Sequence, residues 1–309
     1  MAVFTHITEE QLIRHLAQFD IGALVSFTGI AEGVENTNYK LVTTQGAFIL
    51  TLFEKRTRAE DLPFFITFMK YLHDKGISCP PVIAARNGAE IIPLNGKLSL
   101  ITGFLEGGSV KSIEISHTAS IGDLLAGLHR HGSSFDQHRD NTMSLPAWKM
   151  LISACEGKTD LTPLLQNELT YLAQHWPQNL PAGAVHADLF PDNIFFMGDK
   201  ITGVIDFYFS CTEVFVYDLM LTLNAWCFEP SGLNMKKAAA LLEAYQKKRP
   251  LTEAERKAMN FFGRAAALRI IATRLYDRLH PAPDAVVTAK DPSEYVRILE
   301  FYQTESFPL

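Results

Sequence analysis

The stretch "VHADLFPDNIFF", residues 185–196, places polar groups that resist burial among apolar ones. Within it, His186, Asp188 and Asn193 stand between valine, leucine, phenylalanine and isoleucine residues. A second stretch, "VIDF", puts Asp206 on the far side of a Gly-Asp-Lys turn. The pattern predicts strand, loop, strand, turn and strand, in which the apolar runs are the strands that hold the polar side chains in place.

This set of side chains contains the groups that phosphoryl transfer needs. Asp188 can accept a hydroxyl proton, and Asn193 and Asp206 can hold magnesium through an amide oxygen and a carboxylate. The His186 imidazole can brace the loop, and we group it with Asp188 as a catalytic candidate. For any one of these residues, the alternative is that it satisfies backbone groups of a turn. Together, however, they match the kinase pattern HxDxxxxN followed by Asp-Phe, with Tyr208 in place of the usual glycine.

Composition favours a globular protein of a reducing cytoplasm. The chain has 309 residues, of which 47% are hydrophobic and 20% charged, so it can bury a large core and divide into two lobes. Its formal charge of -6, without a sustained basic run, argues against a nucleic-acid partner. The four cysteines lie far apart and form no CxxC pair. Since no apolar run approaches the roughly 18 residues that span a bilayer, we expect no membrane association, and the oligomeric state is left open.

The first hundred residues predict a small antiparallel sheet with one helix after an opening helix. Thr8 is placed to cap the opening helix. Two apolar, β-branched runs flank the Gln45-Gly46 turn, which is the pattern of a hairpin. The helical periodicity of "AEDLPFFITFMKYLHDKG" ends at Gly76, and two short strands follow. We therefore expect a nucleotide-binding N-lobe over residues 1–104.

From Ser112 onward the periodicity is mostly helical. The predicted helices include "PLLQNELTYLAQHW", "VYDLMLTLNAWCF" and a long segment from Glu253 to Leu279. A linker near residues 104–109 would join the two lobes. The predicted fold class is therefore α+β and bilobal, with a mainly helical C-lobe over residues 105–309 that carries the catalytic and metal-binding loops and the acceptor site.

The stretch "GIAEGVENTNYKL" is rich in glycine and lies between two predicted strands. Backbone amides in such a loop can close over ATP phosphates. Gly29 and Gly33 do not satisfy GxGxxG, so taken alone the stretch is better explained as an ordinary hairpin turn. Its position upstream of the HxDxxxxN motif favours nucleotide binding, with Asn38 as a further candidate.

Arg264, Arg269 and Arg274 occur in "RAAALRIIATRLYD", a predicted helix that is otherwise mostly apolar. An unpaired buried guanidinium is costly, so each must reach solvent or find an anion. Salt bridges are the plain explanation, and Arg269, which has alanines around it, is the candidate for binding a ligand. His129, in "LHRHG", is expected to cap a helix or to contact solvent.

Strings scattered from residue 29 to 295 carry a resemblance that runs nearly end to end. They are "GIAEGVENTNY", "FILTLFEKR", "EDLPFF", "YDLMLTLNAWCFEP", "AALRIIATRLYD" and "KDPSEY", together with the two motif segments. With these strings the chain resembles the homoserine kinases that are related to aminoglycoside phosphotransferases and choline kinases. The HxDxxxxN core specifies the wider kinase-like superfamily, whereas the flanking strings point to the homoserine branch.

The resemblance implies a protein-kinase-like fold and transfer of the ATP γ-phosphoryl group to the hydroxyl of L-homoserine, the step before threonine formation. ATP and magnesium are the implied cofactors. Carried over by position, Asp188 is the catalytic base, Asn193 and Asp206 hold magnesium, and Phe104 marks the hinge against adenine. Homoserine is a zwitterion that needs one cation for its carboxylate, a role that suits Arg269.

One departure from the kinase pattern concerns the third strand, where kinases usually have a lysine. "FILTLF" has Thr51 at about that position. Lys40 or Lys55 would then have to hold the α- and β-phosphates, and Glu60 in the following helix would have another partner.

Two other functions stay open on the sequence. One is a kinase of another small amino alcohol or of an aminoglycoside, and the polycationic aminoglycosides would favour a broadly acidic cleft. The other is a nucleotide-binding protein that has lost catalysis, as the missing strand lysine suggests. The intact HxDxxxxN motif and the aspartate of "VIDF" argue against the second of these.

Overall fold

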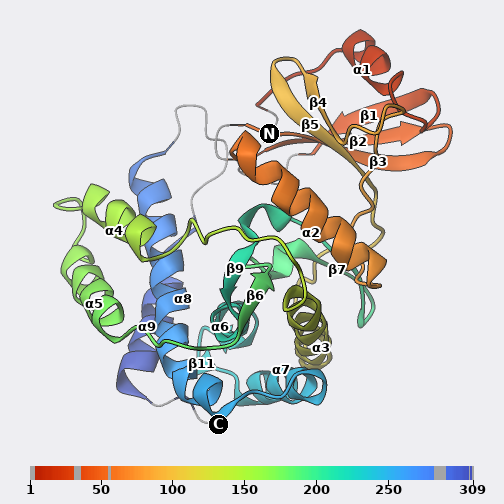
Figure 1. Cartoon of the computed structure of the whole chain (residues 1–309). Helices are drawn as coiled ribbons and strands as arrows, with labels where there is room; N and C mark the ends of the chain where they lie inside the picture. The colour runs from red at the N-terminus through yellow and green to blue at the C-terminus, as the bar shows by residue number, and fades with distance from the viewer. Residues whose placement is uncertain (1–3, 31–35, 55–56, 282–289, 306, 308–309) are drawn as a thin grey trace. The chain divides into compact units, whose positions relative to one another are not determined.

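The computed structural model describes residues 4–30, 36–54, 57–281, 290–305 and 307. It divides into compact units (Figure 1). The first unit comprises Met1–Gly107 and Thr202–Tyr208, and the second comprises Gly108–Ile201 and Phe209–Leu309. The sequence predicted lobes that are continuous in the chain, whereas in the structure a short segment after the HxDxxxxN motif belongs to the first unit.

An antiparallel sheet with the strand order β1-β2-β3-β5-β4 forms the centre of the first unit. Its strands are β1 (Leu24–Gly29), β2 (Thr37–Thr43), β3 (Gly46–Leu52), β4 (Ile91–Leu94) and β5 (Lys97–Gly103). Thr43 pairs with Gly46, which confirms the predicted hairpin. Burial alternates along β2, so one face enters the core while Asn38 and Lys40 are half-buried on the other.

Helices α1 (Glu9–Leu16) and α2 (Leu62–Asp74) also belong to the first unit. Thr8 caps α1 as predicted: its side chain accepts the Gln11 N–H while the Gln11 side chain accepts the Thr8 N–H. Leu12 and Leu16 of α1 join Leu41 of the sheet in one apolar core. This packing fixes one face of the sheet and leaves the face with the half-buried polar side chains for other contacts.

Aromatic packing explains why Thr202–Tyr208 belongs to the first unit. The Phe207 ring packs against Phe68 of α2, with centroids 6.2 Å apart. The Tyr208 ring packs against Phe65 of the same helix, with centroids 5.9 Å apart. These contacts anchor the aspartate that precedes the two aromatic residues.

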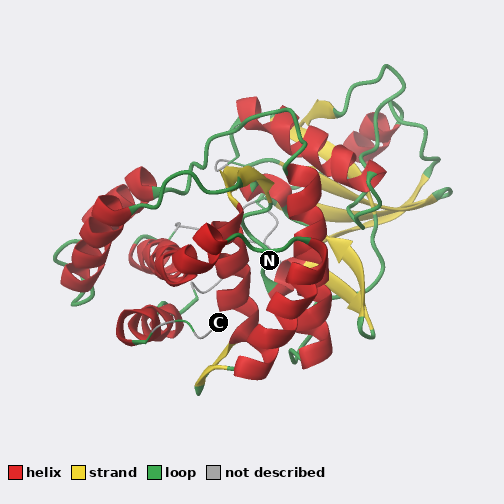
Figure 2. Cartoon of the chain, turned by 60° about the horizontal axis from the view of Figure 1, so that its bottom comes forward, coloured by secondary structure: helices red, strands yellow, loops and turns green. Residues whose placement is uncertain are grey.

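The second unit is mostly helical (Figure 2). Its helices are α3 (Ile115–Gly132), α4 (Leu145–Ala154), α5 (Thr162–His175), α6 (Phe215–Cys227), α7 (Met235–Lys248), α8 (Glu253–Leu279) and α9 (Ser293–Thr304). The long helix predicted from the sequence is α8, and a capping box at Thr252 begins it. Helix α3 lies beside α7, and α8 packs against α6 and α9 (Figure 1). No helix in the described ranges is long and apolar enough to cross a membrane.

Short strands complete the description of the chain. They are β6 (Ala182–Val185), β7 (Ile194–Met197), β8 (Lys200–Val204), β9 (Cys211–Val214), β10 (Phe228–Glu229) and β11 (Gly232–Leu233). Strands β6 and β9 pair antiparallel, with Val185 opposite Cys211. Gly132 lets α3 approach β6 closely, since a Cβ at this position would lie 1.9 Å from the Ala184 carbonyl oxygen. The HADLFPDN loop therefore starts from a strand whose position is fixed by backbone contact.

The substitution Gly132→Ala should destabilise the protein, because the added methyl group meets backbone rather than a movable side chain. Helix propensity alone favours alanine by about 1 kcal/mol, but overpacking costs about 1–3 kcal/mol, so a net loss is expected. Chemical denaturation measures this loss. Gly108→Ala is the matched control, since a Cβ there meets nothing within 4 Å, and its effect should stay within about 0.5 kcal/mol. Equal stability of the two variants would contradict the described packing of α3 on β6.

Candidate active site

Buried side chains of the second unit fix the start of the HADLFPDN loop. Ala187 has a left-handed backbone (φ 61°), which costs an L-residue roughly 1–2 kcal/mol. Its N–H donates to Asp218 Oδ1 of α6 (3.0 Å), and its carbonyl oxygen accepts from Arg269 Nη1 of α8. Asp218 is 0% exposed and Arg269 is 3% exposed. Side chains from α6 and α8 therefore hold the residue that precedes Asp188.

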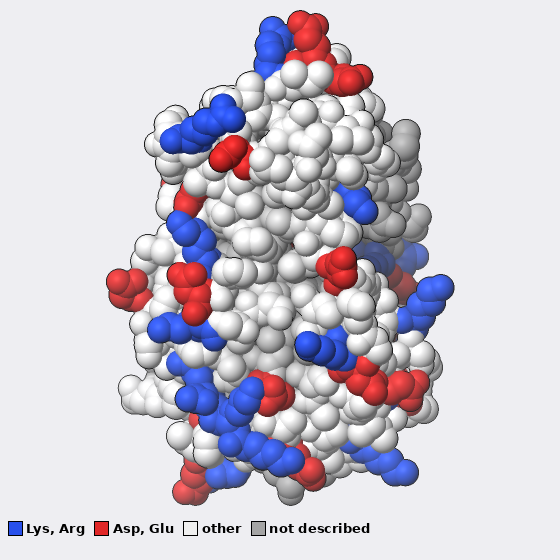
Figure 3. Space-filling model, turned by 90° about the vertical axis from the view of Figure 1, so that its right-hand side faces the viewer, with Lys and Arg blue, Asp and Glu red and all other residues white. Residues whose placement is uncertain are grey.

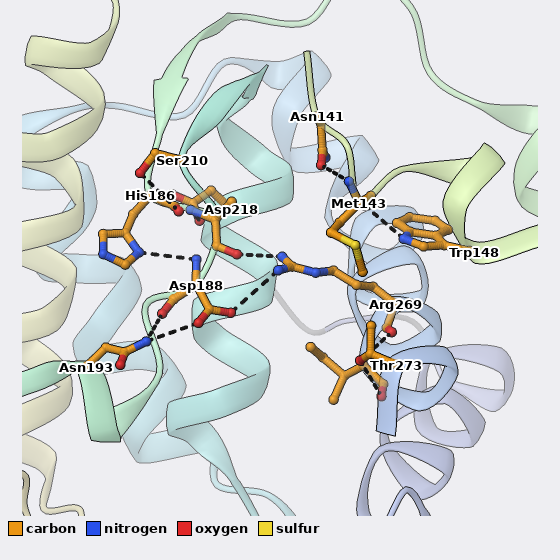
Figure 4. A network of polar contacts seen from close by, with 12 residues as sticks. Asn141, Met143, Trp148, His186, Asp188, Asn193, Ser210, Asp218, Arg269 and Thr273 are labelled. Atoms are coloured by element: carbon orange, nitrogen blue, oxygen red, sulfur yellow. Dashed lines mark hydrogen bonds and ion pairs between the residues drawn. The ribbon is translucent and has the colours of Figure 1, made fainter. Parts of the chain in front are cut away.

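The Asp188 carboxylate is held from both sides, as Figure 4 shows. Its Oδ2 accepts from Asn193 Nδ2 (3.1 Å), and its Oδ1 lies 3.5 Å from Arg269 Nη2. The Asn193 amide also donates to the Asp188 carbonyl oxygen (2.8 Å). The Asp188 side chain is still 18% exposed. The carboxylate is therefore oriented by the protein and partly exposed, two properties that the predicted role of general base requires.

His186 supports the loop from inside. Its imidazole is 0% exposed, and its Nδ1 accepts the Asp188 N–H (3.2 Å). The Ser210 hydroxyl contacts the His186 carbonyl oxygen (3.5 Å). These contacts favour the bracing role over direct proton transfer, although the sequence grouped His186 with the catalytic residues.

Asn193 and Asp206 carry the oxygen atoms that magnesium prefers. Because the Asn193 amide nitrogen faces Asp188, its amide oxygen is directed away from that contact. Asp206, in the first unit, has a left-handed backbone (φ 65°) and a buried Oδ1. No group of three His, Cys, Asp or Glu side chains within the described ranges could hold a metal. Magnesium sites of phosphotransferases need only one or two carboxylates, because nucleotide phosphates complete them, so each of these two side chains carries a donor of the kind that magnesium takes.

Asn38, Lys40 and Thr51 lie on the same face of the N-terminal sheet. Thr51 is opposite Asn38 in the β2–β3 pair, and its hydroxyl donates to Asn38 Oδ1 (2.8 Å). Lys40 Nζ lies 4.1 Å from the centroid of the Phe104 ring. Thr51, which the sequence analysis placed at about the position of the usual kinase lysine, thus orients the Asn38 amide, and Lys40 supplies a cation on this face.

The remaining candidates of the first unit are only partly described. Gly29 is the last residue of β1 and pairs with Tyr39. Gly33 and Lys55 lie outside the described residues, so their roles stay predictions. Glu60 forms an ion pair with Arg58 (3.2 Å), so it has a partner other than the usual strand lysine.

A buried chain of polar groups behind Asp218 was not predicted from the sequence. His129 contacts Asp218 Oδ2 through Nε2 (3.0 Å) and the Tyr245 hydroxyl through Nδ1 (2.7 Å). Arg249 donates to that hydroxyl (2.9 Å) and to Glu255 (2.7 Å). Burial lowers the pKa of His129, and Asp218 opposes this shift. The expectation that His129 caps a helix or contacts solvent was wrong, because the ring is 0% exposed. The sequence signal that could have indicated this network is a single histidine or aspartate within an otherwise apolar helix, as in "LLAGLH" and "VYDLML".

The arginines of α8 find different partners. Arg264 forms a bidentate ion pair with Glu168 (2.7 and 2.6 Å). Arg269 contacts the HADLFPDN loop, and its guanidinium carbon lies 5.2 Å from the centroid of the Phe209 ring. These contacts are made inside the protein. They argue against the predicted role of Arg269 as a clamp for a substrate carboxylate.

Charges of both signs are interspersed on the face of the molecule that Figure 3 shows, and uncharged residues cover most of it. Such a mixture is typical of a solvated protein surface. The expectation that the chain has no nucleic-acid partner rests on its net charge of -6 and stays a prediction.

The sequence matches known kinases over most of its length. Residues 26–259 match the phosphotransferase enzyme family. A homoserine kinase of Nitrobacter hamburgensis is 48% identical over 98% of this chain and 95% of its own length. A homoserine kinase of Agrobacterium fabrum is 46% identical over 98% of this chain and 96% of its own length.

Solved structures share the fold at low sequence identity. Amicoumacin kinase, in complex with AMP-PNP and Ca²⁺, has a TM-score of 0.76 at 15% identity and covers 96% of this chain and 94% of its own. Spectinomycin phosphotransferase has a TM-score of 0.70 at 13% identity, with coverage of 98% and 96%. This likeness confirms the predicted α+β, kinase-like fold and nothing finer. Because the family match spans most of the chain and the sequence relatives span nearly all of it, this chain belongs to the phosphotransferase enzyme family and, within it, to the homoserine kinases.

Proposed function

We propose that this chain is an ATP-dependent homoserine kinase, which transfers the γ-phosphoryl group of ATP to the hydroxyl of L-homoserine. Its products are O-phosphohomoserine, which precedes threonine, and ADP. The observation that carries the proposal is the 48% identity over 98% of the chain to a relative named homoserine kinase. We also propose a cytoplasmic location, because the cysteines Cys79, Cys155, Cys211 and Cys227 are free and buried, as suits a reducing compartment.

Asp188 is the general base in this proposal. The homoserine hydroxyl oxygen bonds to the γ-phosphorus while its proton passes to the Asp188 carboxylate. The bond from the γ-phosphorus to the bridging oxygen breaks, and ADP leaves with the electron pair. The contacts from Asn193 and Arg269, and the 18% exposure of the carboxylate, support this role. His186 keeps the loop in position through the Asp188 N–H.

Asn193 and Asp206 are the proposed magnesium ligands. Bound magnesium would neutralise charge on the β- and γ-phosphates. The orientation of the Asn193 amide supports its part, since the nitrogen serves Asp188 and the oxygen is turned away. The left-handed backbone of Asp206 (φ 65°) is a conformation that is retained where a functional site requires it.

The proposed nucleotide contacts are Gly29, Gly33, Asn38 and Phe104. The hydrogen bond from Thr51 supports the role of Asn38, because it fixes the amide. We propose that Lys40 or Lys55 replaces the strand lysine. The place of Lys40 on the same face as Asn38 supports the first choice.

An ATP-consumption assay with several acceptors tests the function. The fold alone does not choose the acceptor, since amicoumacin, spectinomycin and aminopropanol kinases share it. Homoserine should give a kcat/KM at least about tenfold above that of serine, choline, methylthioribose or kanamycin, as expected of a site built for its polar groups. Preference for kanamycin or choline would make another alcohol the substrate. If none of the acceptors stimulates ATP turnover, the protein is a nucleotide-binding protein without catalysis.

The substitution Asp188→Asn should lower kcat about 10²- to 10⁴-fold, the usual contribution of a general base. Affinity for ATP should change little, because the base acts on the acceptor hydroxyl. Asp192→Asn is the matched control: it removes a carboxylate from the same loop, but one that is 60% exposed and paired with Lys290. For both variants, steady-state kinetics measure kcat and nucleotide titration measures the affinity for ATP. Near-normal turnover of Asp188→Asn would show that another group takes the proton.

A further inference from the structure

The peptide groups on either side of Ala187 are each bound by a buried charged side chain. A left-handed alanine is strained and persists only where its surroundings require it. Here Asp218 accepts the N–H from one side and Arg269 donates to the carbonyl oxygen from the other. Hydrogen bonds to ionised groups are about twice as strong as those between neutral groups. The pair is therefore strong enough to keep Ala187 in this conformation.

The Arg269 guanidinium is enclosed by the protein. Its side chain is 3% exposed, and the Phe209 ring lies against it with a centroid distance of 5.2 Å. Burial acts to lower the pKa of Arg269, but the nearby Tyr217 and Asp188 outweigh it, so the pKa lies above its usual value. The group is thus a permanent buried cation that faces the loop, and a substrate carboxylate would have to displace contacts that already satisfy it.

The same guanidinium also faces the proposed base. Its Nη2 lies 3.5 Å from Asp188 Oδ1, while Asn193 binds the other carboxylate oxygen (Figure 4). Asn193 belongs to the same loop as Asp188. Arg269 belongs to α8, a helix of 27 residues, and so ties the carboxylate to the body of the second unit.

Asp218, which holds the other side of Ala187, is itself fixed. His129 binds its second oxygen (3.0 Å), and the Tyr245 hydroxyl binds His129 in turn (2.7 Å). His129 and Asp218 have 0% exposed side chains. The loop is thus held by buried side chains of two helices, Asp218 on α6 and Arg269 on α8.

We propose that Arg269 is a positioning residue of the phosphoryl transfer: it aims the Asp188 carboxylate at the acceptor hydroxyl and does not bind the acceptor carboxylate. This inference rests on the proposed function, in which Asp188 is the base. A positioning role and a carboxylate clamp predict different kinetic effects when Arg269 is substituted. Misplacing a reacting group lowers kcat, whereas losing a contact that is equal in the ground and transition states raises KM.

The substitution Arg269→Lys tests the proposal, because an ammonium cannot bind the Ala187 carbonyl and the Asp188 carboxylate in the planar geometry of a guanidinium. We expect kcat with homoserine to fall about 10- to 100-fold. The KM values for homoserine and ATP should each stay within about threefold of wild type. A homoserine KM raised about 10- to 100-fold at unchanged kcat would establish the carboxylate clamp and overturn the proposal.

Arg264→Lys is the matched control for general damage to α8. Arg264 lies in the same helix, but its bidentate partner is Glu168. This variant should lose thermal stability while its kcat stays near wild type. An equal fall of kcat in both variants would mean that the Arg269 effect is a loss of structure, and would overturn the positioning role.

Should Arg269→Lys fail to fold, Asp218→Asn tests the same support from the other side. Its amide oxygen can still accept the Ala187 N–H, but less strongly than a carboxylate, so kcat should again fall while both KM values hold. Unchanged kcat in Asp218→Asn would overturn the proposal in that case.

Failure of the proposed function can be distinguished from failure of this inference. If the proposed function is wrong, wild type will not phosphorylate homoserine, or Asp188→Asn will stay active. Loss of activity in Asp188→Asn, with full kcat in Arg269→Lys, would overturn this inference alone.

Discussion

The strained left-handed Ala187, bound by one buried anion and one buried cation, is the constraint on which the site of the second unit depends. Asp218 and Arg269 come from α6 and α8, and each is buried beside the loop it binds. Buried charges are tolerated only where partners compensate them. The helices must therefore pack so that these two side chains meet the loop, which relates the helical core directly to the direction of Asp188.

Phosphoryl transfer asks little covalent chemistry of a protein and much positioning. This demand accounts for the number of contacts spent on one carboxylate: His186 holds its backbone N–H, Asn193 holds one oxygen and Arg269 faces the other. It also accounts for a fold that is shared by kinases of chemically unlike acceptors, including amicoumacin and spectinomycin kinases. Because one fold serves acceptors this different, the fold alone does not choose the acceptor.

The sequence predicted those parts of the structure that depend on neighbours in the chain. Helix α8 was predicted from Glu253 to Leu279 because its periodicity is a local signal. Asp188 and Asn193 come together because one loop carries both. The supports of that loop were not predictable in the same way: His129 and Asp218 are 89 positions apart, and Arg269 is 81 positions from Asp188. Periodicity shows which face of a helix is apolar, but not which distant charge that face will meet. The sequence therefore assigned Arg269 to a ligand without showing its contacts to Ala187 and Asp188, 82 and 81 positions away.

A double-mutant cycle in kcat tests most directly whether Asp218 and Arg269 act together on one residue, Ala187. The cycle compares Arg269→Lys, Asp218→Asn and the combined variant with wild type. If both side chains hold Ala187, the first substitution already frees the loop, and the combined variant should lose little more kcat than the worse single variant, as for residues that act as a unit. If the two losses multiply, the side chains act independently, and the account of a single supported residue is contradicted.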